Sequence, residues 1–309
     1  MSKKYVVVVG AVNIDIGGAP EKNLIPGDSN PGSITSSLGG VGRNIAHNLS
    51  LMGLNVHLIT ALGDDNGAAR IRRSCQELGI DVSASLVVPE ATTSSYLFIN
   101  DQQGDMALAI SDMKIYASLS PDFLESRREL FDNAELVVTD TNISQESLMW
   151  LSEHCAAPLF CDPVSVSKAE KLKGILGSFH TIKPNRIEAE LLSGMSITDE
   201  KSLSLAAKTL LSTGLSRVFI SLGDNGILAA DKYRQARLPC FPTRLVNATG
   251  GGDAATAALA LAYTKQLDLE ESAALALAAG SMAVEHEATI NPNISYEALN
   301  LSLERKNTP

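Results

Sequence analysis

The sequence predicts an α/β protein with a doubly wound, mostly parallel sheet flanked by helices and a small β-sheet lid. Short β-branched runs alternate with helical patterns along the 309 residues, which is typical of such sheets. Two stretches that break this alternation predict the lid. No Pro- or Ser-rich linker, charge block or low-complexity tract divides the chain, so we expect a single domain over residues 1–309.

Strands of the main sheet are expected where short apolar runs occur, at residues 5–9, 56–60, 136–139, 159–161, 181–183 and 218–221. Apolar residues at steps of four and three predict the helices between them. The clearest cases end before a glycine, with Val41, Ile45, Leu49 and Met52 before Gly53, and Ile71, Cys75 and Leu78 before Gly79. The alanine-rich stretches 254–263 and 269–284 predict two largely buried helices.

Residues 14–37 and 92–110 fit this rhythm poorly. The first stretch is rich in Gly, Pro and Asn, and the second alternates apolar and polar residues across the turn DQQG at 101–104. We expect β-hairpins inserted into the sheet order, which could pair into a lid that excludes water from a cleft. Surface hairpins without a function are the alternative.

Composition limits the class of partner. The 35 acidic and 25 basic residues give a net charge of −10, which argues against a nucleic-acid surface and against anionic lipid. There is no signal peptide and no apolar run of the ~20 residues that a membrane helix needs, so we expect a cytoplasmic protein with small-molecule partners. Four cysteines and five histidines show no metal-ligand spacing.

A glycine run, NATGGGDAA at 247–255, opens the first alanine-rich stretch. Backbone N–H groups at a helix N-terminus attract anions, and glycines let the main chain approach a phosphate closely. Gly250, Gly251 and Gly252 can form such an anion hole, beside which Asp253 could take the proton of an attacking alcohol. The segment therefore indicates phosphoryl transfer, with a glycine turn and a surface cap at Asp253 as the alternative.

Four motifs in order resemble the ribokinase/PfkB family of carbohydrate and nucleoside kinases. They are GGVGRNIA at 39–46, KPNRIE at 183–188, SLGDNG at 221–226 and NATGGGD at 247–253. Their order and spacing cover nearly the whole chain. The resemblance implies a ribokinase-like fold, ATP as the phosphoryl donor, Mg²⁺, and a sugar or nucleoside as the acceptor.

On the donor side, the resemblance makes Asp253 the general base and the glycines before it the anion hole. Asn185 and Glu188 would organise the nucleotide phosphates and Mg²⁺, with Glu188 acting through a water molecule. Their spacing alone fits a helix capping box, and both interpretations can hold together. The remaining residues expected along the ATP are Ser221, Gly223, Gly226 and Thr249.

On the acceptor side, Asn13 and Asp15 follow the first strand, at the edge where open α/β sheets bind ligands. An Asp and an Asn can bridge adjacent hydroxyls of a ribose, and the family uses these positions in that way. A simple turn residue is the alternative for Asp15. The other members of this group are the hinge residues Gly39 and Gly40, with Gly42 and Asn44.

Further segments resemble the pseudouridine kinases within this family. They are DSNPG at 28–32, TSSY at 93–96, NIS at 142–144 and DPVS at 162–165, with Arg43 where another sugar kinase carries a lysine. This implies ATP-dependent phosphorylation of the 5′-hydroxyl of pseudouridine, whose base has a free N1–H that a selective site must pair. Ser95 and Asn142 are candidates for that site, and a helix N-cap is an equal alternative for Asn142.

Some expectations stay open. Asn247 replaces an aspartate that helps several relatives to hold a monovalent cation, which weakens the expectation of K⁺ activation. Exposed lid edges would allow two copies to pair as a homodimer. The alternatives to pseudouridine phosphorylation are a kinase of another nucleoside or sugar, and a non-catalytic nucleoside sensor, against which Asp253 and the intact glycine run argue.

Overall fold

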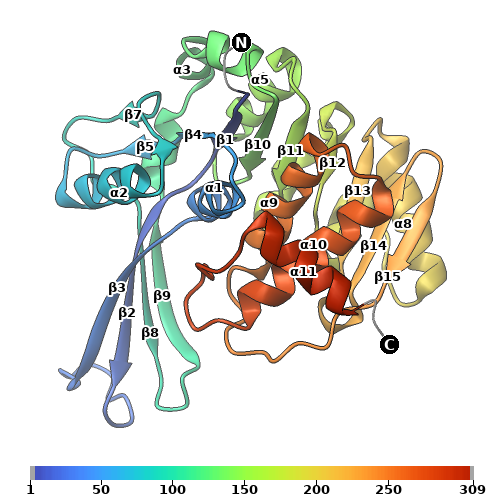
Figure 1. Ribbon diagram of the computed structural model, residues 1–309. Helices are drawn as coiled ribbons and strands as arrows, with labels where there is room; N and C mark the ends of the chain where they lie inside the picture. Colours follow the sequence, from blue (N-terminus) through green and yellow to red (C-terminus); the bar gives the residue numbers. More distant parts are fainter. Residues whose placement is uncertain (1–3, 307–309) are drawn as a thin grey trace.

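A nine-stranded sheet forms the centre of the structure, a computed structural model that describes residues 4–306 (Figure 1). The ends of the expected domain, 1–3 and 307–309, lie outside the described residues. In spatial order the strands are β15 (Gln235–Leu238), β14 (Ile227–Asp231), β13 (Arg217–Ser221), β12 (Thr181–Ile182), β11 (Leu159–Asp162), β10 (Leu136–Asp140), β1 (Val6–Val9), β4 (Val56–Ile59) and β6 (Ile80–Asp81). Pairing is parallel from β6 to β13 and antiparallel for β14 and β15, which confirms the mostly parallel sheet.

Helices cover both faces of this sheet because its strands are apolar on both sides. In β1, Val6 and Val8 belong to one core and Val7 and Val9 to the other. The first core is covered by α1 (Val41–Leu51), α2 (Asn66–Glu77), α9 (Gly251–Thr264), α10 (Leu269–Val284) and α11 (Tyr296–Lys306). The second is covered by α3 (Pro121–Glu125), α4 (Arg128–Asp132), α5 (Gln145–His154), α6 (Val166–Ala169), α7 (Arg186–Ser193) and α8 (Glu200–Ser212).

The two irregular stretches form one small sheet. Its strands are β3 (Gly32–Gly39), β2 (Asn13–Pro20), β8 (Ser95–Asn100) and β9 (Met106–Asp112), in that spatial order. Both hairpins are antiparallel, and β2 pairs with β8 in parallel. Figure 1 shows these long strands projecting away from the body of the molecule. We call this four-stranded sheet the lid.

Most expected boundaries agree with the structure. The helices α1 and α2 end just before Gly53 and Gly79, both of which have the positive φ typical of a helix stop. The strands β10 and β11 run one residue further than expected and end on Asp140 and Asp162. The short pairs β14–β15 and β5 (Ala61–Leu62) with β7 (Leu86–Val87) were not expected from the sequence. Among the described residues, no helix is long and apolar enough to cross a membrane.

Candidate active site

Charged side chains are buried where the central strands end. Lys183 follows β12 directly, and its Nζ lies 3.4 Å from Oδ2 of Asp162, with the two side chains only 6% and 8% exposed. The Thr256 hydroxyl, from α9, donates to the same Asp162 oxygen at 2.7 Å. These contacts connect the carboxyl edge of the sheet to the helix that carries Asp253. Sequence reasoning gave Asp162 and Lys183 no role, although each lies at the end of an apolar strand, where ligands of such sheets bind.

The glycine run begins α9 in the way that an anion hole requires. Gly250 is the N-cap, with φ of 84°, and a Cβ there would lie 2.1 Å from the Thr289 carbonyl oxygen. Asp253 lies in the first turn, where Asn44 Nδ2 donates to its Oδ2 at 2.8 Å. Asp253 is therefore not a surface cap, because the N-cap position belongs to Gly250.

The charges around Asp253 adjust its basicity. Burial is the largest influence and raises the pKa of Asp253, and the nearby Asp162 carboxylate raises it further. The hydrogen bond from Asn44 and the charge of Lys183 oppose this rise. Burial alone would lower the pKa of Lys183, but the carboxylates of Asp162, Glu188 and Asp253 outweigh it and raise that pKa, so Lys183 stays charged. The site thus pairs a fixed cation with a carboxylate that can hold a proton.

A cavity of about 370 Å³ adjoins the start of α9. Among the residues expected to bind the nucleotide or phosphate, it brings together Ser221, Gly223, Gly226, Gly251 and Gly252, with Lys183 beside them. Its other wall is apolar and includes Leu277 and Val284 of α10. A Cβ on Gly251 would lie 2.9 Å from Val284 Cγ1, so an alanine there would require Val284 to shift.

Thr249 does not line that cavity. Its hydroxyl donates to Asn247 Oδ1 at 2.7 Å, and the Thr249 backbone N–H donates to the same oxygen at 3.0 Å. Asn247 Nδ2 in turn donates to the Glu287 carbonyl oxygen at 2.9 Å. The side chain of Asn247 therefore stabilises the loop before α9 through its own hydrogen bonds.

Asn185 and Glu188 form the capping box of α7. Asn185 Oδ1 accepts from the Glu188 N–H at 2.9 Å, and Glu188 Oε2 accepts from the Asn185 N–H at 2.8 Å, which confirms this interpretation. Glu188 is buried, and burial raises its pKa. Asn185 lies beside Ser221 and Gly223 in a groove next to the cavity at α9, so α7 begins close to the candidate anion hole.

The acceptor residues Asn13 and Asp15 lie at the base of the lid in β2. A Cβ on Gly39, the partner strand's last residue, would lie 1.9 Å from Asp15 Oδ2, so only glycine leaves that carboxylate in place. Burial raises the pKa of Asp15, and the Arg43 guanidinium opposes this. Asn13 Oδ1 accepts from the Ser94 hydroxyl at 2.8 Å.

Close contacts with the backbone also explain why the hinge residue Gly40 and the nearby Gly42 are glycines. Gly40 has φ of 98°, and a Cβ on it would lie 2.4 Å from the Ala11 carbonyl oxygen. Gly42 packs against Gly10, and its N–H donates to Asp140 Oδ2 at 2.8 Å. These two glycines let the start of α1 approach the end of β1, where the acceptor residues begin.

Of the two residues expected to read the base, Ser95 lies away from Asp15, and the N-cap alternative for Asn142 is wrong. Ser95 pairs with Ile14 across the lid, whereas Asp15 pairs with Tyr96, so Ser95 lies on the opposite face of the lid from Asp15. Ser94, one residue earlier, is the serine that contacts the acceptor residue Asn13. Asn142 is not a helix N-cap, because Ser144 caps α5. Instead, Asn142 Oδ1 accepts from Lys168 Nζ.

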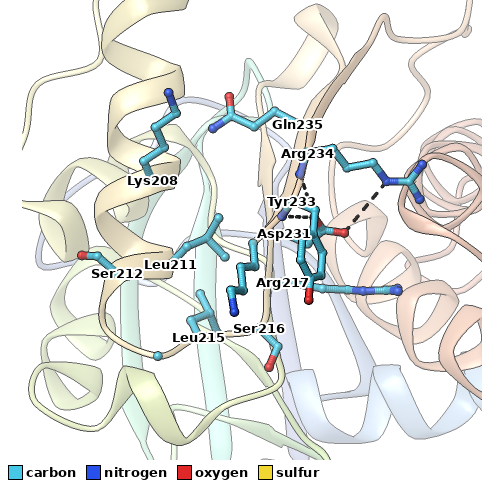
Figure 2. A pocket seen from close by; sticks show the side chains of 12 residues that line it. Lys208, Leu211, Ser212, Leu215, Ser216, Arg217, Asp231, Tyr233, Arg234 and Gln235 are labelled. Atoms are coloured by element: carbon cyan, nitrogen blue, oxygen red, sulfur yellow. Dashed lines mark hydrogen bonds and ion pairs between the residues drawn. The ribbon is translucent and has the colours of Figure 1, made fainter.

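A wider groove, of about 920 Å³, lies far from these residues. Figure 2 shows its polar lining, where Asp231 Oδ1 accepts from the backbone N–H groups of Tyr233 and Arg234 at 2.8 and 2.9 Å. Arg217 in its wall begins β13, so the groove opens at the amino end of that strand. Open α/β sheets bind ligands at the carboxyl ends, which favours the cavity beside α9 as the active site.

The model of the pfkB family of carbohydrate kinases matches residues 3–295 of the chain. The chain belongs to the pfkB family. Pseudouridine kinase of Escherichia coli is 38% identical over 95% of this chain and 94% of its own length. Guanosine-inosine kinase of Exiguobacterium acetylicum is 26% identical over 88% of this chain and 91% of its own length.

A solved carbohydrate kinase from Agrobacterium tumefaciens has the same architecture, with a TM-score of 0.87 and 27% identity over 97% of both chains. Ribokinase structures share the fold too, which confirms the ribokinase-like class. As a member of this family, the pfkB protein is an ATP-dependent kinase that phosphorylates a sugar or a nucleoside.

Proposed function

We propose that this pfkB protein is a pseudouridine kinase that transfers the γ-phosphoryl group of ATP to the 5′-hydroxyl of pseudouridine. The observation that carries the chemistry is the position of Asp253, in the first turn of α9, hydrogen-bonded to Asn44 and close to the Lys183 cation. The choice of acceptor is supported by the 38% identity to a pseudouridine kinase along nearly the whole chain.

In this proposal Asp253 accepts the proton of the attacking hydroxyl. The backbone N–H groups of Gly250, Gly251 and Gly252 stabilise the negative charge of the phosphoryl group in transit. Lys183 adds a positive charge that burial keeps unscreened. Because the pKa of Asp253 is raised, the base is ionised only above the range of an ordinary aspartate, and activity should fall as the pH drops through that pKa.

The cavity beside α9 would hold the nucleotide. Ser221, Gly223 and Gly226 line it, and the apolar side chains of α10 suit a purine base. Glu188, at the buried start of α7, would hold hydrated Mg²⁺ through water, since Mg²⁺ usually keeps several of its waters.

Thr249 and Asn247 would act by shaping the loop before α9. With Asn247 engaged in that loop, we expect activity without added K⁺.

The acceptor would lie between Asp253 and the base of the lid. Asn13 and Asp15 would bind its ribose hydroxyls, and the lid would exclude water from the phosphoryl donor. Asn142, which follows β10, and Lys168, in α6, offer a carbonyl oxygen and an ammonium for the two polar edges of the base. A part-buried polar pair of this kind disfavours a base that leaves it without hydrogen-bond partners.

We also propose that the lids of two copies pair in a homodimer in the cytoplasm. One lid face carries exposed apolar side chains in adjacent strands, Ile34 in β3, Leu97 in β8, and Leu108 and Ile110 in β9. A long apolar face of this kind, with open strand edges, is a template for association.

The test is turnover with MgATP and a panel of acceptors, namely pseudouridine, uridine, adenosine, inosine, ribose and fructose, compared by kcat/KM. We expect the highest value for pseudouridine, with the phosphate on the 5′-oxygen of the product. A higher value for another acceptor would reject pseudouridine and retain the kinase. Binding of nucleosides without any turnover would favour a sensor.

A further inference from the structure

Asn44 has one side-chain contact that its expected role as a sugar ligand does not explain. It lies in the first turn of α1, is 7% exposed, and donates from Nδ2 to Asp253 Oδ2 at 2.8 Å. Its Oδ1 is buried and has no hydrogen-bond partner among the described residues. Asn48 Oδ1, one turn along the same helix, is also buried without a partner in the described part of the chain, so what distinguishes Asn44 is its direct contact with Asp253. A hydroxyl of the acceptor could supply the donor that Asn44 Oδ1 lacks.

The contact with Asp253 restricts how that carboxylate can act. With Oδ2 held by Asn44, the other oxygen, Oδ1, is the one free to receive a proton. The same contact links two helices, since Asn44 belongs to α1 and Asp253 to α9. The N-cap of α1 is the hinge residue Gly40, and the N-cap of α9 is Gly250 of the anion hole. A change at the base of the lid can therefore reach Asp253 through a single side chain.

The acceptor supplies the missing donor, since every acceptor alcohol carries O–H groups. Asp15 lies at the same base of the lid, next to Gly39, and it can only accept hydrogen bonds when ionised. Asn44 Oδ1 adds a second acceptor atom within the same region. A ligand with two neighbouring hydroxyls could satisfy both atoms at once.

We propose that Asn44 is a positioning residue that couples acceptor binding to the general base. Its Nδ2 orients Asp253, and its Oδ1 receives a hydrogen bond from one ribose hydroxyl of the acceptor, which fixes the amide and thereby the carboxylate. This inference rests on the proposed kinase function but not on pseudouridine as the acceptor.

The pH dependence of kcat separates positioning from a merely structural role. The groups that face Asp253 are Asp162 from β11, Lys183 after β12, and Asp140 from β10, and all three remain in Asn44 variants. Loss of the Asn44 hydrogen bond removes stabilisation of the ionised base. Asn44→Leu should therefore move the acid limb of kcat to higher pH by about one unit, and Asn44→Asp should move it further because it adds a second carboxyl.

Asn48 supplies the matched control. It lies one turn along α1, is fully buried, and donates to the Asn44 backbone oxygen rather than to Asp253. Asn48→Leu should leave the acid limb at the wild-type pH. Should Asn44→Leu fail to fold, Asn44→Ser, whose shorter side chain does not reach Asp253, takes its place. An acid limb that stays at the wild-type pH in the Asn44 variants would overturn the proposal.

A second experiment tests the hydroxyl contact. The best acceptor from the panel is compared with analogues that each lack one ribose hydroxyl, in wild type and in Asn44→Leu. For one hydroxyl, we expect a loss of kcat in the wild type and little further loss in the variant, because the two changes remove the same contact. Equal losses in both proteins for every hydroxyl would refute the coupling. A wild type that phosphorylates no acceptor would instead reject the proposed function itself.

Discussion

The donor side of the active site and the lid differ in how firmly their residues are held. Asp162 and Lys183 are almost fully buried and contact each other and α9. The lid instead exposes large apolar side chains, with Ile34 at 80% and Ile110 at 61% exposure. The partners of a buried charge hold it in one position. The contacts of a lid side chain depend instead on which face of the sheet it occupies. The residues proposed for phosphoryl transfer thus lie in the buried body, whereas Asn13 and Asp15, which are proposed to bind the ribose, lie at the base of the lid.

The largest effect should come from removing the buried cation of the donor side. In Lys183→Met, the carboxylates of Asp162, Glu188 and Asp253 lose their counter-charge, and breaking such a buried cluster costs about 3 to 5 kcal/mol of unfolding free energy. Urea unfolding measures this. Lys173→Met is the control, because its exposed pair with Glu170 should contribute at most ~1 kcal/mol. Equal costs would show that the donor side is no more firmly held than the surface.

The glycine run should be the next most sensitive position. Gly250→Ala introduces both a left-handed alanine and a Cβ against the Thr289 carbonyl oxygen. Gly53→Ala introduces only the first of these, since nothing lies within 4 Å of its Cβ, and should cost about 1 to 2 kcal/mol. We expect Gly250→Ala to cost more than Gly53→Ala and to raise the KM for ATP. If the two variants lose equal stability and keep wild-type KM, the anion hole does not depend on the close approach at Gly250.

On the lid, Asp15→Ala should weaken acceptor binding by about 10- to 100-fold, the usual worth of a charged hydrogen bond. The KM for ATP should stay near the wild-type value, because the cavity proposed for the nucleotide lies beside α9 and Asp15 does not line it. Asp28→Ala, in the exposed turn between β2 and β3, is the matched control. Unchanged acceptor affinity in Asp15→Ala would remove Asp15 from the site.

The smallest effect on catalysis should come from the outer lid surface. Ile110→Lys places a charge on the apolar face, whereas Ser111→Lys places it on the other face of the same strand. Sedimentation should show weaker self-association for Ile110→Lys than for Ser111→Lys. A monomeric wild type, or equal behaviour of the two variants, would exclude pairing through this face.

Much of the fold could be predicted because the central strands are apolar on both faces and the helices end at glycines such as Gly53 and Gly79. The hairpin of β14 and β15 was missed because β14 begins with four apolar residues in a row and β15, although it alternates, is only four residues long. The capping box of Asn185 and Glu188 was predictable because it depends on local spacing alone.

The misses in the site have different causes. Asp162 and Lys183 contradict the rule that charged residues are exposed, and only the tertiary structure shows that each compensates the other. The choice between Ser94 and Ser95 depends on strand register, where a shift of one residue moves a side chain to the other face. Asn142 could be interpreted as a helix cap because Asn and Ser are both favoured at the N-cap position, and in the structure Ser144, two residues later, caps α5.

The most direct test of the account is a single-turnover comparison of the wild type and Asp253→Asn with MgATP and the best acceptor. The substitution keeps the shape of the side chain and removes only its ability to take a proton, so phosphoryl transfer should slow by about 10²- to 10⁴-fold, while binding of both substrates stays nearly unchanged. A transfer rate near that of the wild type would contradict the assignment of Asp253 as the general base.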